Sequence, residues 1–533
     1  MSENSLSRRQ FLSLVGAAGG STAIYRTSMA LGLMQDTGLP ATIDLMPVGR
    51  GRRKALILGA GMAGLTVAYE LERAGYDCHI IEASYRPGGR NLTLRGGDIV
   101  DELGNTQVCE FDDEPHLYFN AGPARIPGHH RRVLHYCKLL GVELEVMAND
   151  SRRAYTQEPG AFGGRPIQKR EYMADARGFM SELLYKAVDR NAFEQPLSAE
   201  DRERLLELAI SFGDLNPQGV YTGSSRAGYA SGGFLKRGEL KDPLDFQEIL
   251  SSGFWRRGMH FADSEDWAAP LLTPVGGMDN IVKAFLRKLH TPITLNAQVQ
   301  SIQLRDEGVD VVFSHKGRRH KASADYCFNS IPTHFIAGIY NNFPTDYAKG
   351  LSSLQPGHLS KIGLQMKERF WEREEIYGGI TSTSQEIGEI WYPSHGIHKQ
   401  KGIVLGAYLF GFNRRHGQPS NFFERMTPGE RIRFAAEQGD NIHPGYSGYI
   451  ENGISIPWSR MNHMMGCGSG WTDEVRAQYF SRLQNPEGRH YMIGDQISYH
   501  TSWQEGAFAS AEYALLDLDK RVRADAAARR IAG

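Results

Sequence analysis

The sequence has few cysteines, no excess of charge of either sign and no long apolar run, and each absence excludes a class of protein. Its 533 residues hold five cysteines with no C-x-x-C pair, so neither a disulfide framework nor a cysteine zinc site is indicated. Sixty Lys and Arg residues balance 61 Asp and Glu residues, which leaves no basic face for nucleic acid. No run of 18 apolar residues follows the N-terminal segment. We therefore expect no metal and neither nucleic acid nor a membrane as a partner.

What the sequence does contain is a dinucleotide-binding unit between Lys54 and Arg90. The apolar run 55–58 predicts a buried parallel strand, and a helix is predicted over 62–74. The turn between them carries the glycines of a G-x-G-x-x-G motif, Gly59, Gly61 and Gly64. Glycines in this turn let the backbone approach a pyrophosphate, which the positive end of the helix attracts.

A second predicted strand, 78–81, leads directly to Glu82. An acid at this spacing from the glycines accepts hydrogen bonds from a ribose hydroxyl. A carboxylate there favours the free 2′-hydroxyl of FAD or NAD and disfavours the 2′-phosphate of NADP.

Two further segments favour FAD. Arg86-Pro87-Gly88-Gly89-Arg90 resembles the G-G-R element of the flavin amine oxidase superfamily, and the segments 491–496 and 503–507 resemble its C-terminal flavin signature. The resemblance implies an α/β fold: a Rossmann-like FAD domain of the glutathione-reductase type, a mixed-sheet substrate domain and a helical insertion. It assigns FAD contacts to Gly59, Gly61, Met62, Ala63, Gly64, Glu82, Ala83, Gly89, Arg90, Gly122, Arg125, Val299, Gly494, Asp495, Gly506 and Ala507.

The two flavin motifs lie about 400 residues apart, so the FAD domain must be assembled from both ends of the chain. A chain of 533 residues is long enough for two or three domains. We expect an N-terminal arm (1–50), three parts of the FAD domain (51–114, 261–357 and 481–533), two parts of the substrate domain (115–165 and 358–480) and a helical insertion (166–260).

The substrate class is indicated by the segment 118–130, which contains Gly-Pro-Ala-Arg-Ile-Pro. It is similar to the Gly-Pro-x-Arg-x-Pro motif of the L-amino-acid oxidases, whose arginine pairs with the substrate carboxylate. A planar guanidinium at Arg125 matches a carboxylate fork and stays charged when desolvated. The same resemblance assigns a second carboxylate ligand to Tyr408, with Tyr392 as the alternative.

The resemblance places a lysine and a tryptophan beside the flavin. Lys361 matches the superfamily lysine that assists the reaction with oxygen, and Lys367 is the competing candidate. Trp503 matches the aromatic position against which amine substrates pack. The catalytic group expected is thus Lys361, Arg125, Tyr408 and Trp503.

Together these residues predict an FAD-dependent L-amino-acid oxidase that converts L-amino acids, and large neutral or aromatic ones best, to 2-oxo acids, ammonia and hydrogen peroxide. The alternatives are a monoamine or polyamine oxidase, which would not need Arg125, a dehydrogenase that uses another electron acceptor, and a binding protein that keeps FAD without turnover. Glu386 and Glu389 keep a preference for basic amino acids open. FAD is expected to be non-covalent, because the covalent members of the family use a cysteine near the C-terminal motif, and the segment 497–500 offers only His500.

The N-terminal segment carries Arg8-Arg9 before a Gly- and Ala-rich stretch, and resembles a twin-arginine export signal. It predicts a periplasmic or secreted protein, or a cytoplasmic one if the segment is retained. A homodimer or higher homo-oligomer is expected.

Overall fold

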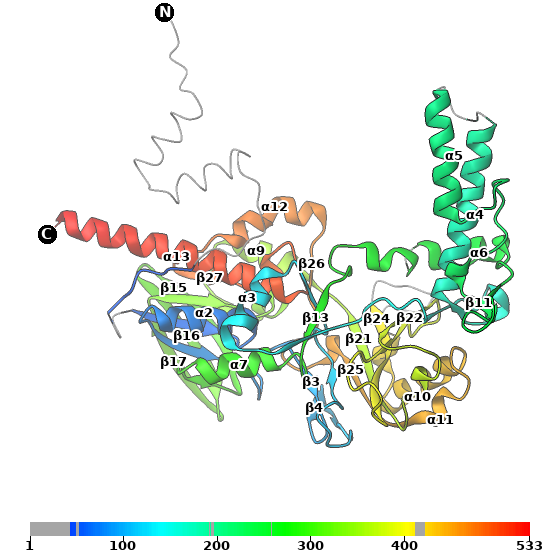
Figure 1. Cartoon of the computed structure of the whole chain (residues 1–533). Coiled ribbons are helices and arrows are strands. Elements are labelled where there is room, and N and C mark those ends of the chain that lie inside the picture. Colours follow the sequence, from blue (N-terminus) through cyan, green and yellow to red (C-terminus); the bar gives the residue numbers. More distant parts are fainter. Residues whose placement is uncertain are drawn as a thin grey trace, which may run out of the picture. The chain divides into compact units, whose positions relative to one another are not determined.

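A five-stranded parallel sheet forms the first half of the fold, in the order β14-β2-β1-β18-β27. The computed structural model describes residues 43–49, 53–190, 192, 197–256, 258–410 and 422–532. The strands are β1 (Lys54–Leu58), β2 (Asp77–Ile81), β14 (Ile293–Thr294), β18 (Tyr326–Asn329) and β27 (His490–Met492). The strands predicted at 55–58 and 78–81 are therefore present, and β27 brings the C-terminal motif beside them, as expected (Figure 1).

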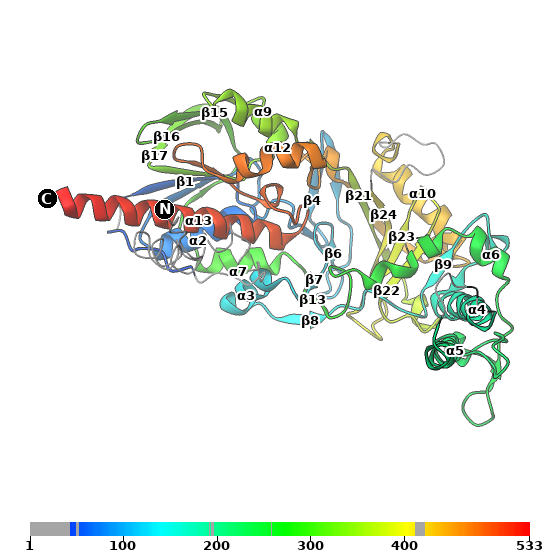
Figure 2. The same ribbon diagram turned by 90° about the horizontal axis from the view of Figure 1, so that it is seen from above.

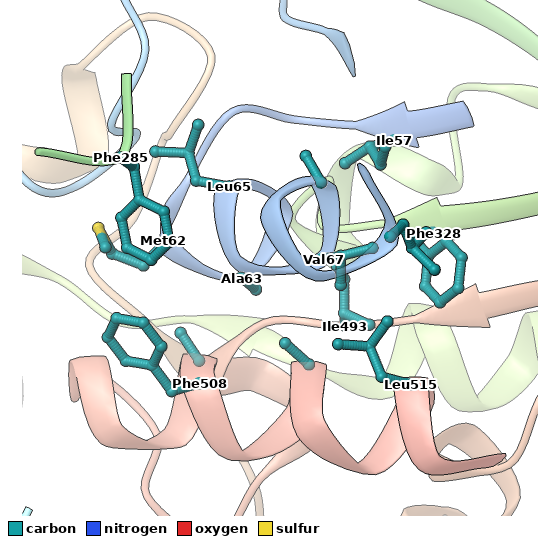
Figure 3. Packing of buried hydrophobic residues seen from close by; sticks show 14 of the residues in the cluster. Ile57, Met62, Ala63, Leu65, Val67, Phe285, Phe328, Ile493, Phe508 and Leu515 are labelled. Carbon is teal, nitrogen blue, oxygen red and sulfur yellow. The ribbon is translucent and has the colours of Figure 1, made fainter. Parts of the chain in front are cut away.

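Both faces of this sheet are buried, because successive side chains of β1 point into different hydrophobic clusters. Ala55 and Ile57 pack with helices, whereas Leu56 and Leu58 pack with a second sheet. The helices on the first face are α2 (Met62–Arg73), α3 (Arg131–Leu140), α7 (Asn280–Lys288) and α13 (Gln504–Ala532). Figure 3 shows α2 and α13 packed across Val67, Ile493 and Leu515. The last helix thus stabilises the first dinucleotide-binding turn.

The other face is covered by a four-stranded sheet of order β17-β16-β15-β19, visible above the parallel sheet in Figure 2. Its strands are β15 (Ala297–Arg305), β16 (Gly308–His315), β17 (Arg318–Ala324) and β19 (Tyr340–Asn341). The segments 298–304 and 308–313 predict a hairpin-like pair of strands, and β15 and β16 form it. Val299, from β15, reaches the cofactor side of the fold.

A seven-stranded mixed sheet forms the substrate half, in the order β10-β9-β22-β23-β24-β21-β25. Its strands are β9 (Tyr155–Gln157), β10 (Ile167–Gln168), β21 (Leu359–Met366), β22 (Gly379–Thr383), β23 (Glu389–Tyr392), β24 (Gly402–Phe410) and β25 (Ile450–Pro457). The alternation of apolar and polar residues over 358–460 predicts an antiparallel sheet that covers a cavity, with one face of each strand polar. Instead every residue of β21 is buried. The face away from the cavity packs on α10 (Pro428–Asp440) and α11 (Tyr446–Tyr449).

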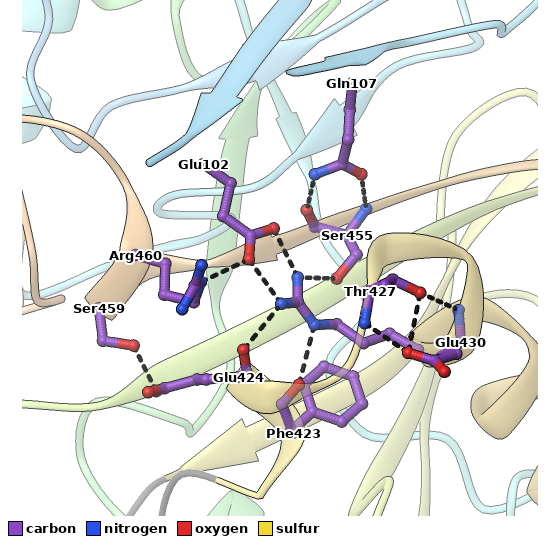
Figure 4. Close-up of polar contacts among 10 residues, drawn as sticks. Glu102, Gln107, Phe423, Glu424, Thr427, Glu430, Ser455, Ser459 and Arg460 are labelled. Atoms are coloured by element: carbon purple, nitrogen blue, oxygen red, sulfur yellow. Dashed lines mark hydrogen bonds and ion pairs between the residues drawn. The ribbon is translucent and has the colours of Figure 1, made fainter. Parts of the chain in front are cut away.

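A buried ion pair connects this sheet to the hairpin of β4 (Ile99–Glu102) and β5 (Asn105–Val108). The Arg431 guanidinium, from α10, donates two hydrogen bonds to the Glu102 carboxylate, of 2.6 and 2.7 Å (Figure 4). Arg460 adds a third contact of 2.8 Å. Both Glu102 and Arg431 have side chains that are 0% exposed, so neither charge is compensated by water.

The helical insertion consists mainly of α4 (Lys169–Asp189), α5 (Ala199–Gly213) and α6 (Phe246–Ser251). Ser198 caps α5 as its sequence predicts, accepting a hydrogen bond from the Asp201 N–H. The pair Asp242-Pro243 predicts a second amphipathic helix through Leu250, with the proline in its first turn, and this predicted start is wrong. The helix begins at Phe246. Asp245 caps it, because its carboxylate accepts hydrogen bonds from the backbone N–H groups of Gln247 and Glu248 in the first turn.

A three-stranded sheet connects the two halves: β7 (Ile126–Pro127), β13 (Leu271–Pro274) and β8 (Leu144–Val146). Residues 43–49, which we assigned to the N-terminal arm, contact the FAD domain, since the Met46 N–H donates to Asp519 at 2.7 Å. The predicted twin-arginine motif lies outside the described residues. No helix among the described residues has the length and apolar character needed to span a bilayer.

Candidate active site

One cavity of about 730 Å³ extends from the dinucleotide turn to the strands β21 and β24. Most of the predicted cofactor residues line it: Gly59, Gly61, Met62, Ala63, Glu82, Ala83, Gly89, Arg90, Gly122, Arg125, Val299, Gly494, Asp495 and Ala507. Lys361, Tyr408 and Trp503 line it as well. The fold thus brings the flavin motifs and the predicted substrate residues to a single cavity.

The glycine turn has the shape that a phosphate requires. Gly59 has a φ of +99°, which favours glycine. A Cβ added at Gly61 would meet no protein atom within 4 Å, although this residue lines the cavity. The backbone at Gly61 is therefore open to a bound group, as a pyrophosphate site needs.

Glu82 lies at the end of β2, where the ribose of a dinucleotide is bound. Its carboxylate accepts hydrogen bonds from the N–H groups of Ala60 (2.6 Å) and Ser84 (2.7 Å). Burial raises the pKa of Glu82 in spite of these bonds. The carboxylate is thereby fixed in orientation at the cavity wall.

Two predicted glycines serve packing instead of lining the cavity. A Cβ at Gly64 would lie 2.1 Å from the carbonyl oxygen of Gly59, so this glycine lets α2 approach β1. A Cβ at Gly506 would lie 2.2 Å from the His500 carbonyl. Neither residue is among those that line the cavity, so direct FAD contact is not supported for these two.

The two flavin motifs meet in an ion pair between Arg90 and Asp495. The Arg90 guanidinium also donates to the Cys467 carbonyl at 2.7 Å, and Asp495 accepts from the Ser502 N–H at 2.7 Å. These contacts fix both side chains at the cavity. They join segments separated by 405 residues in the chain.

The cavity also contains polar atoms that have no partner among the described residues. The side-chain oxygen Oδ1 of Asn91 and the nitrogen Nε2 of Gln504 are both buried and both belong to cavity-lining residues. Buried polar atoms are normally hydrogen-bonded, so these two fit a polar ligand. Gln504 begins α13, whose N-terminus attracts negative charge. The residues present therefore fit FAD, although the sequence patterns did not identify Asn91 or Gln504.

Arg125 is a buried cation without a carboxylate partner. It is 6% exposed, and no described Asp or Glu forms an ion pair with it. Its guanidinium carbon lies 3.6 Å from the centre of the Trp267 ring and 4.6 Å from that of Trp391. Its Nε atom has no hydrogen-bond partner among the described residues. Burial lowers the pKa of Arg125 to about 10, so it stays charged at neutral pH.

Lys361 is the second buried cation of the cavity, at 3% exposure. Its ammonium nitrogen donates to the carbonyl oxygen of Gly122 at 2.5 Å and lies 4.9 Å from the centre of the Tyr408 ring. Burial, followed by the charge of Arg125, lowers the pKa of Lys361 to about 7. By contrast, the competing Lys367 is exposed and donates to the Gly448 carbonyl.

The two tyrosine candidates lie on different sides of the sheet. Tyr408 lines the cavity and packs edge-on against Trp391, with ring centres 5.1 Å apart. The Tyr392 hydroxyl is hydrogen-bonded to Thr381 (2.8 Å) and His443 (2.6 Å), in the core beneath α10. Tyr392 therefore cannot serve as the carboxylate ligand.

An aromatic cage of Phe261, Trp267, Trp391 and Trp503 surrounds the Arg125 guanidinium, and the motifs identified neither Phe261 nor Trp267. Trp267 lies before β13 and contacts both the Arg125 guanidinium and the ring of Trp503, at 5.5 Å between ring centres. No local pattern around Trp267 distinguishes it from a core residue. Its proximity to Arg125 follows from the pairing of β7 with β13.

Comparisons with known proteins also identify flavin-containing oxidoreductases of amines and amino acids. The family model described as flavin containing amine oxidoreductase matches residues 62–514. A flavin-dependent L-tryptophan oxidase of Lentzea aerocolonigenes is 25% identical over 87% of this chain and 97% of its own. An L-amino-acid oxidase of Gloydius blomhoffii is 26% identical over 88% and 89%.

Solved structures share the fold at lower identity. A putrescine oxidase bound to putrescine has a TM-score of 0.57 at 16% identity, with 87% of this chain and 98% of the other covered. A cyclohexylamine oxidase from Brevibacterium oxydans has a TM-score of 0.56 at 15% identity, covering 88% and 99%. At such identities the likeness establishes the fold alone.

Proposed function

Because this chain belongs to the flavin containing amine oxidoreductases, we propose that it is an L-amino-acid oxidase that prefers large neutral and aromatic side chains. As a member of that family it is an oxidoreductase of amines or amino acids, and its cofactor is FAD. The observation that carries the finer proposal is Arg125, a buried cation in the cavity with no carboxylate of the described chain paired to it.

An unpaired buried cation is costly unless a ligand supplies the opposite charge. The α-carboxylate of an amino acid supplies that charge, whereas a simple amine has no negative group to offer Arg125. A guanidinium can bind a carboxylate through two parallel hydrogen bonds. Arg125 therefore favours an amino acid over an amine.

The cavity walls support the preference for large side chains. Trp391, Trp503 and Phe410 line the cavity around Tyr408. Of the two carboxylates proposed for a basic substrate, Glu386 accepts from Gln438 at 2.5 Å. Glu389 accepts from the cavity-lining Trp391 at 2.7 Å, and its charge partly offsets the lowering by burial of the pKa of Arg125 and of Lys361. Neither glutamate is among the cavity-lining residues, which disfavours a specific site for arginine or lysine.

The protein's own contribution is to bind and orient the substrate. Arg125 and the Tyr408 hydroxyl hold the carboxylate, and the aromatic walls exclude water from the reacting carbon. Glu82, Arg90, Asp495 and Gln504 would hold FAD, which supplies the two-electron acceptor when bound. Lys361 carries a proton at Nζ below pH 7 or so, where a positive charge assists oxygen reduction. The imino acid product hydrolyses to a 2-oxo acid and ammonia.

The proposal is tested by peroxide release from purified holoenzyme with L-phenylalanine, L-arginine and phenethylamine. We expect kcat/KM to be highest for L-phenylalanine. A higher value for phenethylamine would identify an amine oxidase. An arginine value ten times that of phenylalanine would identify a basic-amino-acid oxidase, and turnover of a dye without peroxide would identify a dehydrogenase.

A further inference from the structure

A cluster of three histidines and one aspartate lies next to the substrate cavity. The Nε2 atoms of His129, His130 and His500 all face the oxygen Oδ1 of Asp266, at 3.1, 2.9 and 3.5 Å respectively. The four ligand atoms lie within 4.8 Å of one another. None of these side chains has a role in the function proposed above.

The cluster joins three segments that are distant in the chain. His129 and His130 follow β7, Asp266 precedes β13, and His500 lies in the loop before α13. His130 is buried, while the other three side chains are partly exposed and accessible from solvent. This separation explains why the sequence indicated no metal site. The ligands come from three segments that are far apart in the chain, and no single segment contains a recognisable metal-binding motif.

We propose that this cluster binds one Zn²⁺ ion through His129, His130, His500 and Asp266. Zinc bonds of about 2.0–2.2 Å to histidine nitrogen and carboxylate oxygen place tetrahedral ligands roughly 3.3–3.5 Å apart. The three distances to Asp266 Oδ1, 2.9, 3.1 and 3.5 Å, lie at or up to about half an ångström below that value, and all four ligand atoms lie within 4.8 Å of one another, so small side-chain shifts would complete the site. Three imidazoles and one carboxylate form a nitrogen- and oxygen-rich set of the kind that binds zinc.

The zinc ligands are adjacent to the aromatic cage around Arg125. The His130 ring packs edge-on against Trp503, with ring centres 5.0 Å apart, and Asp266 directly precedes Trp267. Both tryptophans lie over the Arg125 guanidinium. A bound ion therefore cross-links the loops that carry two walls of the cage, and stabilises the folded state without touching the reacting atoms.

The test uses the purified holoenzyme, stripped with EDTA, loaded with ZnCl₂ and passed through a desalting column. We expect one zinc per chain by elemental analysis. Since an ion that binds only the folded state stabilises it, the thermal midpoint should rise by roughly 3 °C at saturating zinc. Each measurement is independent of the substrate that the enzyme oxidises, so it can fail while the proposed function stands.

Three variants complete the test. His500→Gln and Asp266→Asn keep polar side chains of similar size but weaken the ligand set, and both should lose the retained zinc and the thermal shift. His135→Gln alters an exposed histidine on α3 and should keep both. Flavin absorbance verifies that each variant is folded. Zinc below one-tenth per chain in the wild type, or an equal thermal shift in all variants, would show a hydrogen-bonded cluster without an ion.

Discussion

The guanidinium carbon of Arg125 lies 3.6 Å from the centre of the Trp267 ring, so an aromatic face, and no carboxylate of the described chain, accompanies this buried charge. A ring face attracts the cation but occupies none of its in-plane N–H donors. Nη1 makes one long hydrogen bond, of 3.5 Å, to the Asn149 Oδ1, and Nε has no partner among the described residues, so most of the donors remain available to a carboxylate while the tryptophan holds the guanidinium in position. This relationship makes Arg125 the residue on which the substrate class depends.

Replacing Arg125 by Met should reduce kcat/KM for L-phenylalanine by about 10² to 10⁴, since hydrogen bonds to charged groups contribute roughly 1.5–3 kcal/mol each. Although the family resemblance also assigns an FAD contact to Arg125, the residues proposed to hold FAD are Glu82, Arg90, Asp495 and Gln504, so FAD content should be unchanged. Activity on phenethylamine should fall little or rise, because the variant removes a repulsive charge. Arg318→Met, at an exposed site on β17, is the control. An equal loss on both substrates would contradict a carboxylate site.

Lys361 should make the reaction with oxygen depend on pH. Its pKa of about 7 in the folded protein means that the ammonium is present below pH 7 and lost above it. Stopped-flow measurement from pH 6 to 9 should show the oxygen rate constant falling through this range. Lys361→Met should lower the constant by about 10² at pH 6 and abolish the pH dependence. Lys367→Met, at an exposed lysine, should behave as the wild type; a pH profile shared by all three proteins would exclude Lys361.

Lys361 should also make the stability of the protein depend on pH, and here the stability should rise with pH while the oxygen rate constant falls. Burial lowers its folded pKa below the ordinary value of 10.5, so between pH 7 and 10.5 the unfolded chain binds a proton that the folded chain has lost. The stability contribution of Lys361 therefore rises with pH across that window. Denaturant unfolding should find Lys361→Met more stable than the wild type at pH 7, with the difference shrinking toward pH 10. A constant difference would show that the lysine is not desolvated.

The sequence predicted those parts of the site whose residues lie close together in the chain. Gly59, Gly61 and Glu82 belong to one strand-turn-helix-strand unit, and their chemistry follows from spacing alone. Asn91 was missed because a single polar residue beside a motif carries no periodic signal. Gln504 lies inside the segment 503–507, but the resemblance assigned contacts there only to Gly506 and Ala507. Trp267 was missed because its partner lies 142 residues earlier, brought near by the pairing of β7 with β13.

A choice between the two tyrosines was available from periodicity. Neighbouring residues of a strand point to opposite faces. Trp391 lines the cavity, so Tyr392, the next residue of β23, must point to the other face. The position of the cavity was needed to decide which face mattered, and that depends on how the seven-stranded sheet packs against α10. The alternation therefore predicts that Trp391 and Tyr392 face opposite sides of the sheet, but it does not predict which of the two faces the cavity.

Removing one charge of the buried pair between Glu102 and Arg431 should destabilise the protein strongly. Glu102→Gln leaves Arg431 buried and uncompensated, and we expect a loss of about 3–5 kcal/mol. Asp101→Asn, at the neighbouring partly exposed position, should cost less than about 1 kcal/mol. The two are compared by denaturant unfolding, with kcat measured under native conditions. A loss for Glu102→Gln no larger than for Asp101→Asn would show that water reaches the pair.

FAD should be released unmodified when the protein is precipitated with acid. His500 faces Asp266 and is not among the cavity-lining residues, whereas Cys467 does line the cavity. Burial raises the pKa of the Cys467 thiol to about 11, so its reactive thiolate form is scarce at neutral pH. Absorbance at the flavin band should therefore appear in the supernatant. Flavin retained by the pellet, and released by Cys467→Ser, would identify a covalent link at this cysteine.

Tyr408 and Tyr392 offer a matched pair that separates binding from folding. Tyr408→Phe removes a hydroxyl at the cavity, and the loss of one hydrogen bond to a charged carboxylate should lower kcat/KM for L-phenylalanine about 10- to 100-fold. Its thermal midpoint should change little. Tyr392→Phe removes a hydroxyl that bonds Thr381 and His443 in the core, which should cost about 1–3 kcal/mol of stability and leave kcat/KM unchanged.

Steady-state peroxide assays and thermal unfolding of both variants distinguish these roles. Phenethylamine supplies the internal control, since a substrate without a carboxylate should not respond to Tyr408→Phe. If Tyr408→Phe lost activity equally on both substrates, the hydroxyl would act on a group other than the carboxylate. If Tyr392→Phe lost activity without losing stability, the carboxylate ligand would have to be sought on β23, and the assignment of faces in the seven-stranded sheet would be wrong.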